Sequence, residues 1–552
     1  AAAGLVTVAA AAVTFVVARN DPGPDPCGAQ QARLAGVWDD AVRAHGRASF
    51  AATQSPLAQP TWDRVVAHID RYAGAWLDRA RDRCAEIRDH RDPADAGILR
   101  DRCLTGRLAG LGALTPALMT IDRAGIEHAV EAAGHLPDLA ICDDVAALRE
   151  LPLPPADAAQ RAGADALGRE LDAIQAQKAL GNYPAALERA AQAVIAARSL
   201  GYAPREASAL YEAGGLEHQL ARDHALEDLA AASERADVAH DDRLRFEALA
   251  AIIEVRIKES KLDAARTAAR QARAVLDRIG SAPRYEVEMR FADARIARAE
   301  EASPRAITLY EEAVVWAERV VPHDELLLGT ARINLAQAYV LSERLADGLA
   351  QMELGRSGLI EAIGPDHPRI AGLHVLEGSV AATREDYTAA LAAFERAVAV
   401  YDRAVGVDSR IALNARFDVG LMNLLLHRYE AAAAVFRAAI PVSIRYFGPD
   451  HIEVAGWYTS LGEAYLRLGD TARAIEQAQR GIAIAEHHPE APSELANAWV
   501  VVGEAMWLAA KDRPRASSLL RKARAVYVAG GAAQANQVRQ LDDWMHAHGI
   551  ER

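Results

Sequence analysis

The segment AGWYTSLGEAYLRLGDTARAIEQAQRGIAIAE, residues 455–486, decides the fold, because its pattern of small and large side chains returns along the chain. In steps of 42 residues, small residues recur at Ala306, Gly348, Ala390, Ala432, Ala474 and Ala516. Four residues after each stand Tyr310, Met352, Phe394, Phe436, Ala478 and Leu520, and seven after each stands alanine or glycine. Offsets of four and seven lie on one face of a helix. Each step therefore predicts one closely packed helix.

A second series of small residues predicts a second helix in every step. Ala336, Gly378, Gly420 and Gly462 are also 42 residues apart, and each lies twelve residues before a member of the first series. Residues 364–368 (Gly-Pro-Asp-His-Pro) and 448–451 (Gly-Pro-Asp-His) recur between steps. Glycine ends a helix, proline cannot continue it, and the aspartate is expected to cap the next helix. Each step is thus a helix hairpin.

Stacked hairpins of this kind form a solenoid, whose units pack only against their neighbours. Weaker copies of the pattern, such as Ala186, Ala190 and Ala193, precede the regular ones. We predict a solenoid of about nine hairpins over residues 156–530. Residues 531–552 are then expected to form a C-terminal helix that caps the last hairpin.

Residues 455–486 resemble the tetratricopeptide repeat, whose characteristic positions are occupied by Leu461-Gly462, Tyr465, Gly469, Ala474 and Gly481. The 42-residue step is similar to the long variety found in kinesin light chains and many bacterial proteins. Gly348 and Ala478 depart from the family pattern. The resemblance implies an all-α, right-handed solenoid of helix hairpins that binds protein partners.

The chain opens on 18 uncharged, mostly apolar residues, Ala1 to Ala18, which predict a transmembrane helix over residues 1–19. The alternative is a trimmed signal peptide, with Val16-Val17-Ala18 at its cleavage site. Under both alternatives the rest of the chain is exported. Residues 20–26 contain three prolines and are interpreted as a linker.

All four cysteines lie in the first 142 residues, at Cys27, Cys84, Cys103 and Cys142. An even number of cysteines after an export signal favours two disulfides, because oxidising compartments preserve them. Buried free thiols and a metal site are alternatives, although the spacing lacks the close pairs typical of zinc. Of the three possible pairings we favour the nested one, Cys84 with Cys103 and Cys27 with Cys142. Helical spacing of apolar residues predicts a small bundle over residues 27–150, before the proline-rich boundary at residues 151–155.

The segment before the repeats resembles the region that follows the membrane helix in tetratricopeptide-bearing bacterial serine/threonine protein kinases. The matching residues are Pro26-Cys27, Leu34, Trp38, Trp62, Tyr72, Trp76, Cys84, Leu99-Arg100, Arg102-Cys103-Leu104, Arg107, Leu136-Pro137, Leu139 and Cys142. This resemblance implies a sensor or docking region on the periplasmic side of a bacterial inner membrane, with a kinase domain upstream of Ala1.

The residues themselves give no catalytic pattern. His90-Arg91-Asp92 begins like a kinase catalytic loop, but Gly97 stands where that loop needs asparagine, and Asp-Phe-Gly does not occur. The net charge of −14 and the absence of a basic patch argue against nucleic acid. We therefore predict no enzyme activity, no cofactor and no metal.

The remaining candidate is the concave side of the solenoid, which the first helix of each hairpin is expected to line. The polar residues predicted to contact a partner there are Asn334, Gln337, Ser379, Asn414, Glu463, Arg467, Asn497 and Glu504. The alternative for each is a side chain that only faces solvent. We predict a membrane-tethered protein-interaction module of unknown oligomeric state; the alternative function is the extracytoplasmic sensor of a receptor kinase.

Overall fold

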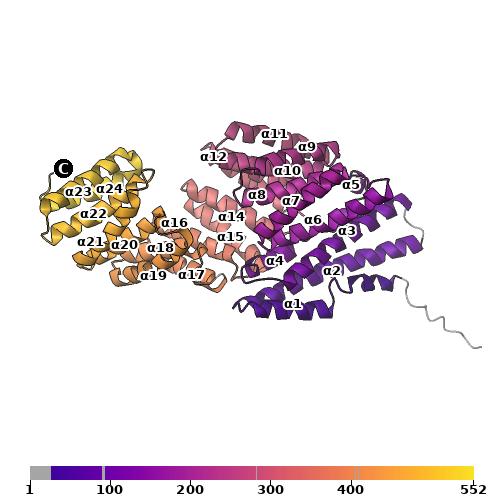
Figure 1. Ribbon diagram of the computed structural model, residues 1–552, viewed down its shortest axis with the longest axis horizontal. Coiled ribbons are helices and arrows are strands. Elements are labelled where there is room, and N and C mark those ends of the chain that lie inside the picture. Colours follow the sequence, from indigo (N-terminus) through magenta and orange to yellow (C-terminus); the bar gives the residue numbers. More distant parts are fainter. Residues whose placement is uncertain are drawn as a thin grey trace, which may run out of the picture.

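The computed structural model describes residues 27–89, 94–280, 282–301, 303–321, 323–404, 406–407 and 409–551. Over these residues the chain is helical and has no strand, which confirms the all-α prediction. A bundle at the N-terminal end is followed by stacked helix hairpins (Figure 1). The predicted transmembrane helix, the linker and the His90-Arg91-Asp92 motif lie outside the described residues. None of the helices found in the described ranges is long and apolar enough to cross a membrane.

Successive helices pack in pairs from α6 to α23, so the described chain contains nine hairpins. The pairs are α6 (Ala158–Ala179) with α7 (Tyr183–Leu200), α8 (Ala203–Gln219) with α9 (Ala225–Val238), α10 (Asp242–Lys258) with α11 (Leu262–Ile279), α12 (Pro283–Ala299) with α13 (Ser303–Ala317), α14 (Glu325–Leu341) with α15 (Leu345–Ile363), α16 (Pro368–Thr383) with α17 (Tyr387–Ala404), α18 (Ile411–Leu425) with α19 (Tyr429–Phe447), α20 (Ile452–Arg467) with α21 (Thr471–Ala485), and α22 (Pro492–Leu508) with α23 (Arg513–Ala529). The short 3-10 helix η3 (Gly531–Gln534) leads to α24 (Ala535–Ala547), which packs against α23.

Glycine permits the close approach of two helices within a hairpin. A Cβ atom built on Gly378 of α16 would lie 2.6 Å from the Phe394 ring, and one on Gly420 of α18 would lie 2.3 Å from the Phe436 ring. Both rings are buried in the core. The smaller Ala478 is compensated by a closer approach of the helix backbones, because a Cβ on Gly462 would lie 3.1 Å from the carbonyl oxygen of Ala474. The repeat can therefore vary at Ala478 and still close its hairpin.

The junctions between hairpins follow the predicted pattern with one correction. Gly364 and Gly448 end α15 and α19 with φ of 91° and 89°, a conformation that glycine adopts without strain. The next helix is capped by the histidine and not by the aspartate that precedes it. Nδ1 of His367 accepts a hydrogen bond from the Arg369 amide at 3.2 Å, and Nδ1 of His451 accepts one from the Glu453 amide at the same distance.

The N-terminal bundle contains two long antiparallel helices and several short ones. Its elements are η1 (Gly28–Leu34), α1 (Asp40–Ala52), α2 (Ala58–Arg88), α3 (Ala94–Met119), α4 (Ile126–Gly134), η2 (Ala140–Asp143) and α5 (Val145–Arg149). Trp62 and Trp76 of α2 are fully buried. The indole nitrogen of Trp76 donates to the carbonyl of Leu104 at 2.8 Å, which satisfies its polar group in the core.

Two disulfides are present, but the nested pairing was wrong. The bonds join Cys27 to Cys84 and Cys103 to Cys142. The contact of Trp76 with Leu104 sets the register of α2 against α3, and this register places Cys84 level with residue 96, seven positions before Cys103. Seven helical residues span about 10 Å, whereas a disulfide needs Cα atoms within about 7 Å. Instead, each long helix is bonded to a short element, η1 or η2, that packs against it.

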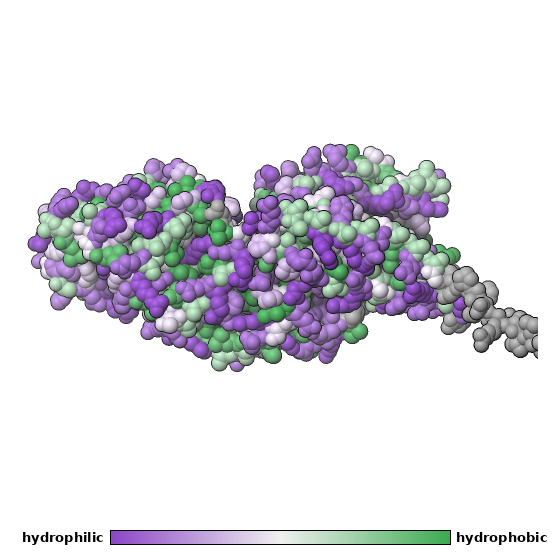
Figure 2. Space-filling model, turned by 90° about the horizontal axis from the view of Figure 1, so that it is seen from below, coloured by the Kyte–Doolittle hydropathy of each residue, from purple (hydrophilic) through white to green (hydrophobic). Residues whose placement is uncertain are grey.

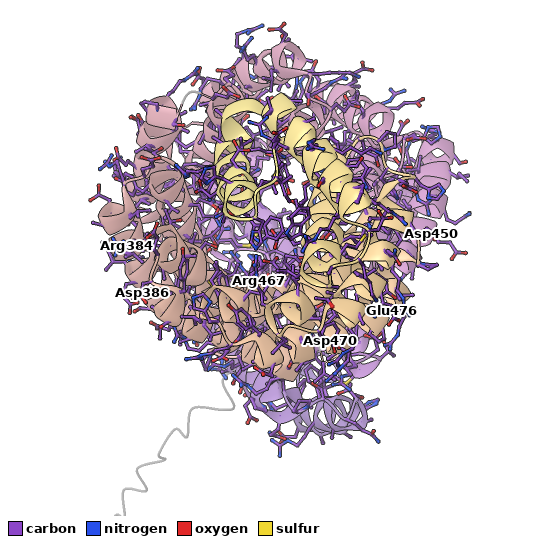
Figure 3. All side chains as sticks on the ribbon, turned by 90° about the vertical axis from the view of Figure 1, so that its left-hand side faces the viewer. Arg384, Asp386, Asp450, Arg467, Asp470 and Glu476 are labelled. Carbon is purple, nitrogen blue, oxygen red and sulfur yellow. A yellow bond between two sulfur atoms is a disulfide. The ribbon has the colours of Figure 1, made fainter. Side chains whose placement is uncertain are left out.

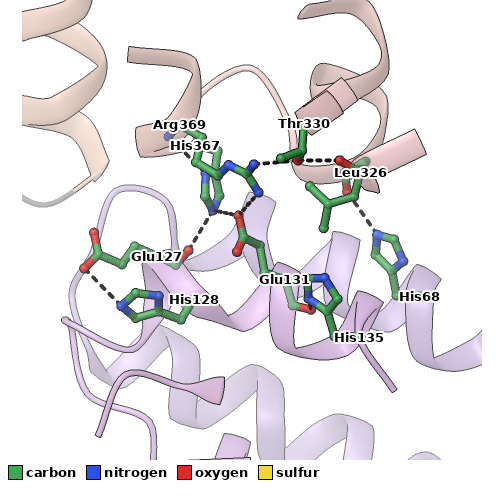
Figure 4. Close-up of polar contacts among 10 residues, drawn as sticks. His68, Glu127, His128, Glu131, His135, Leu326, Thr330, His367 and Arg369 are labelled. Carbon is green, nitrogen blue, oxygen red and sulfur yellow. Dashed lines mark hydrogen bonds and ion pairs between the residues drawn. The ribbon is translucent and has the colours of Figure 1, made fainter. Parts of the chain in front are cut away.

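The bundle also contacts the middle of the solenoid, as Figure 4 shows. Nε2 of His367 donates to the carbonyl of Glu127 in α4 at 2.8 Å, while Arg369 forms an ion pair with Glu131 at 3.1 Å. Nε2 of His68 in α2 donates to the carbonyl of Ala362 at 3.1 Å. Apolar residues of α2, α4, α15 and α16 share one core around these bonds. We call this interface the clasp.

We expect Gly378→Ala to destabilise the protein by about 1–3 kcal/mol, because the added methyl group would overpack the core against the buried Phe394 ring. Urea unfolding of the full chain measures this loss. Gly372→Ala in the same helix is the control: nothing lies within 4 Å of its added Cβ, so it should gain about 0.5–1 kcal/mol. An equal response of the two variants would contradict the packing argument.

Peptide mapping of the unreduced protein by mass spectrometry should recover two cross-linked pairs, Cys27 with Cys84 and Cys103 with Cys142. The register of α2 and α3 excludes the nested bonds without a shift of one helix along the other. Recovery of Cys84 linked to Cys103 would show that this register is wrong.

Candidate partner-binding surface

The first helices of the hairpins form the inner surface of the curved stack. Successive first helices approach each other closely among α6, α8, α10 and α12, and again among α18, α20 and α22. No two successive second helices in the described chain approach each other comparably. A stack whose first helices are closer together than its second helices curves toward the first helices. Viewed from the C-terminal end, the helices are arranged around a hollow; Arg467 lies near the middle, beside the hollow, whereas Asp450, Glu476 and Arg384 lie toward the outside of the molecule (Figure 3).

All eight predicted contact residues lie on first helices of the C-terminal five hairpins. Asn334 and Gln337 belong to α14, Ser379 to α16, Asn414 to α18, Glu463 and Arg467 to α20, and Asn497 and Glu504 to α22. Gln337, Ser379, Asn414 and Arg467 are exposed, whereas Glu504 is buried. The Ser379 hydroxyl donates to the Val375 carbonyl of its own helix at 3.0 Å. Whether these residues bind a partner stays a prediction.

Four of the eight residues come together in the last two hairpins of the stack. Arg467 lies 3.4 Å from Glu463 and 3.6 Å from Glu504. The Tyr527 hydroxyl of α23 donates to Asn497 at 2.7 Å. Burial is the main cause that raises the pKa of this hydroxyl. Repulsion from nearby carboxylates raises the pKa further; these belong to Glu463, Glu494 and Glu504. We call the group of Glu463, Glu494, Asn497, Glu504 and Tyr527 the acidic pocket; Arg467 lies beside it.

Glu504 is the most constrained member of the acidic pocket. Only 4% of the residue is exposed, and its Oε2 atom accepts no hydrogen bond. Burial raises the pKa of Glu504 to about 7; Arg467 lowers it and Glu463 raises it further, each by less. Burial also raises the pKa of Glu494, with Glu453 as a second cause. Burial therefore favours the neutral form of both carboxyl groups.

Glu504 faces the pocket because the register of α22 differs from that of the earlier repeats. The 42-residue spacing places Glu504 in series with Gly462. However, Gly503 occupies the position that faces the second helix, since a Cβ there would lie 2.8 Å from Leu520. The one-residue shift turns Glu504 by about 100° around the helix, away from the close helix contact.

Asn414 lies apart from the acidic pocket, in a cavity of about 780 Å³ between the bundle and α18–α20. Arg123 and Glu127 line it from the bundle, and Arg410, Tyr446 and Phe447 line it from the solenoid. The Arg410 guanidinium stands 5.3 Å from the centre of the Phe447 ring, which is a cation–π contact. The arrangement offers apolar and charged groups side by side.

The inner surface of the N-terminal hairpins is also acidic. Glu212 of α8 is buried, pairs with Lys178, and accepts a hydrogen bond from Gln175 at 2.9 Å. On the next first helix, burial raises the pKa of Glu247 to about 8, and repulsion from Glu288 and other carboxylates adds to the shift. These residues were missed in the sequence, because the early repeats are irregular and gave no register from which to choose them.

Glu494 and Tyr527 were also missed. Glu494 lies one turn before Asn497 on α22. Tyr527 lies on the second helix α23, so only the packing of α22 against α23 brings it to the pocket. The surface in Figure 2 is mostly polar, and its apolar residues form separate small patches. No group of three or more histidine, cysteine, aspartate or glutamate side chains among the described residues is arranged to hold a metal ion.

The architecture defines an α-helical hairpin solenoid, and comparison with known families identifies its repeats. Residues 369–444 and 411–487 match the family model of the tetratricopeptide repeat. Residues 369–487 are therefore tetratricopeptide repeats. No curated protein matches the chain significantly.

Several solved structures are similar to this chain. The kinesin light chain-like repeats of Podosopora anserina are 15% identical, with 38% of this chain and 100% of that chain covered and a TM-score of 0.33. The apo form of RapI is 13% identical; the match covers 70% of this chain and 93% of RapI, with a TM-score of 0.48. A Rap protein complexed with competence and sporulation factor is 14% identical; the match covers 62% of this chain and 99% of the Rap protein, with a TM-score of 0.37.

Glu504→Gln should stabilise the protein at pH 8 by about 2–3 kcal/mol and leave its stability unchanged at pH 4.5. The folded-state pKa is raised, so folding resists ionisation of Glu504, and stability is lost as the pH rises from about 4.5 to about 7. Glutamine does not ionise and avoids this loss. Urea unfolding at both pH values measures the difference.

Glu476→Gln, at an exposed position of α21, is the control, and the stability of the protein should change little in this variant. A Glu504→Gln variant that is less stable than the unaltered protein at pH 8 would contradict the burial of a poorly compensated charge.

Proposed function

We propose that the protein is an interaction module that binds an extended segment of a protein partner along the inner surface of its C-terminal hairpins. The observation that carries the proposal is the acidic pocket, where the polar side chains of Glu463, Arg467, Asn497 and Glu504 converge on the inner surface of the last two hairpins. The tetratricopeptide match over residues 369–487 supports the same role.

The location of the module is a further part of the proposal. Residues 1–18 carry no charge, and the bundle after them holds two disulfides, which persist in oxidising compartments. These observations favour a membrane-tethered, extracytoplasmic protein. The second candidate, a sensor region of a receptor kinase, rests on the sequence resemblance of residues 26–142 alone. Sequencing upstream of Ala1 tests it, and an upstream region without a kinase domain would remove it.

Selection of peptides displayed on phage tests the interaction role. Twelve-residue random peptides are selected on the purified full chain, and enriched peptides are then measured against two variants that block the inner surface, Ser379→Trp and Arg467→Trp. Both side chains are exposed on first helices, so the added bulk should spare the core. We expect at least one variant to weaken each peptide by roughly tenfold or more, which is 1.4 kcal/mol of binding free energy.

Glu476→Trp is the matched control, because Glu476 is an exposed position on the second helix α21. It should leave peptide binding unchanged. The absence of any enriched peptide, or binding that neither inner-surface variant weakens, would contradict the proposal.

A further inference from the structure

A separate cavity lies on the inner surface of the N-terminal hairpins. Its volume is about 330 Å³, and it opens between three successive first helices, α8, α10 and α12. The lining residues, none of which belongs to a second helix, are His218, Glu254, Ile257, Lys258, Arg295, Arg298 and Ala299. We propose that this cavity, which we call the basic cavity, binds the phosphate group of a phosphate ester. The inference does not depend on the proposed function, because the two surfaces lie on different hairpins.

The first argument is the charge of the walls. Three of the lining residues, Lys258, Arg295 and Arg298, are cationic. Glu254 is the only carboxylate among the seven. Burial lowers the pKa of His218, and the nearby Lys258 lowers it further, so His218 is neutral at pH 7 and adds no charge. The walls therefore carry a net charge of +2, which a phosphate dianion neutralises and a single carboxylate would only halve.

The second argument is that two of the three cations are unpaired. Glu254 forms its ion pair with Arg295. Within the described part of the chain, Lys258 and Arg298 form no ion pair and their side chains form no hydrogen bond. Both are exposed, in the last turns of α10 and α12. Their donor groups are thus available to an anion in the cavity.

The third argument is a buried hydroxyl group close to the same walls. Tyr310 of α13 is 2% exposed, and its hydroxyl forms no hydrogen bond with any residue that the structure describes. Burial raises the pKa of this hydroxyl, Arg298 and Arg295 lower it, and Glu254 raises it further. The hydroxyl therefore lies near the cavity and is a neutral donor for an anion that enters it.

The size and the apolar part of the cavity favour an ester over bare phosphate. A volume of about 330 Å³ is at the lower end of the range for small-molecule sites. Ile257 and Ala299 add apolar surface to walls that are otherwise polar. The phosphate oxygens would bind the cations, for which the planar guanidinium of Arg298 is suited, and the organic part would contact the two apolar residues.

Phosphorus NMR of two probes, titrated with the full chain at pH 8, tests the proposal. N-acetyl-phosphoserine N-methylamide represents a phosphorylated side chain of a protein, and glycerol phosphate represents a free small ester. We expect at least one probe to bind with a Kd below about 1 mM, and inorganic phosphate to displace it roughly tenfold better than acetate does. The probe that binds more tightly identifies the source of the phosphate.

Two variants place the anion in the basic cavity. Lys258→Gln and Arg298→Gln should each weaken probe binding by roughly tenfold, because each removes a charge-assisted hydrogen bond. Arg270→Gln is the matched control: it removes the same charge from an exposed position of the second helix α11 and should leave the Kd unchanged. All three positions are exposed, and circular dichroism confirms that each variant is folded.

Cations in the last turn of a helix also interact favourably with the helix dipole, a role that needs no ligand. The absence of binding of both probes at about 10 mM would leave only that role and overturn the inference. Binding that neither Lys258→Gln nor Arg298→Gln weakens would overturn it as well. Acetate that displaces a probe as well as inorganic phosphate does would overturn the assignment of a phosphate group. All of these results leave the proposed function intact, because its peptides are tested on other hairpins.

Discussion

The close approach of two helices at a small residue is the contact on which the rest of the molecule depends. Gly378 and Gly420 leave room for the rings of Phe394 and Phe436, and Gly462 allows backbone contact where Ala478 replaces a ring. Dense packing of this kind leaves little freedom in the position of one helix against the next. Repeated along the chain, it fixes the hairpins, and the nearer approach of the first helices to each other gives the stack its inner surface.

The clasp joins the start of α16 to the N-terminal bundle. His367 and Arg369 at the start of α16 bind Glu127 and Glu131 of α4, although about 240 residues separate them in the chain. The solenoid therefore returns to the bundle after five hairpins, and α17–α24 follow this contact in the chain (Figure 1). Both His367 ring nitrogens are used, one as the cap of α16 and one in the clasp, and burial lowers the pKa of this histidine. The acidic pocket lies in this later part of the stack.

Contacts that repeat along the chain could be predicted from the sequence, and contacts between distant segments could not. The 42-residue spacing located both helices of each regular hairpin, and Gly364 and Gly448 located the junctions. The disulfide pairing was wrong because it depends on the register of α2 against α3, which the cysteine spacing does not contain. The clasp depends on how far five hairpins turn. The acidic pocket was partly predicted, since Glu463, Arg467, Asn497 and Glu504 were chosen by repeat position, while Tyr527 enters from a second helix.

Hydrogen exchange of the full chain with and without a selected peptide tests most directly whether the inner surface binds the partner. Amide exchange reports local opening, so a bound segment slows it in the helices that it contacts. Our account predicts slower exchange in the first helices α20 and α22 and unchanged exchange in the second helices α19 and α21, whose outer faces point away from the hollow. Slower exchange confined to α19 and α21 would contradict it and place the binding surface on the outside of the solenoid.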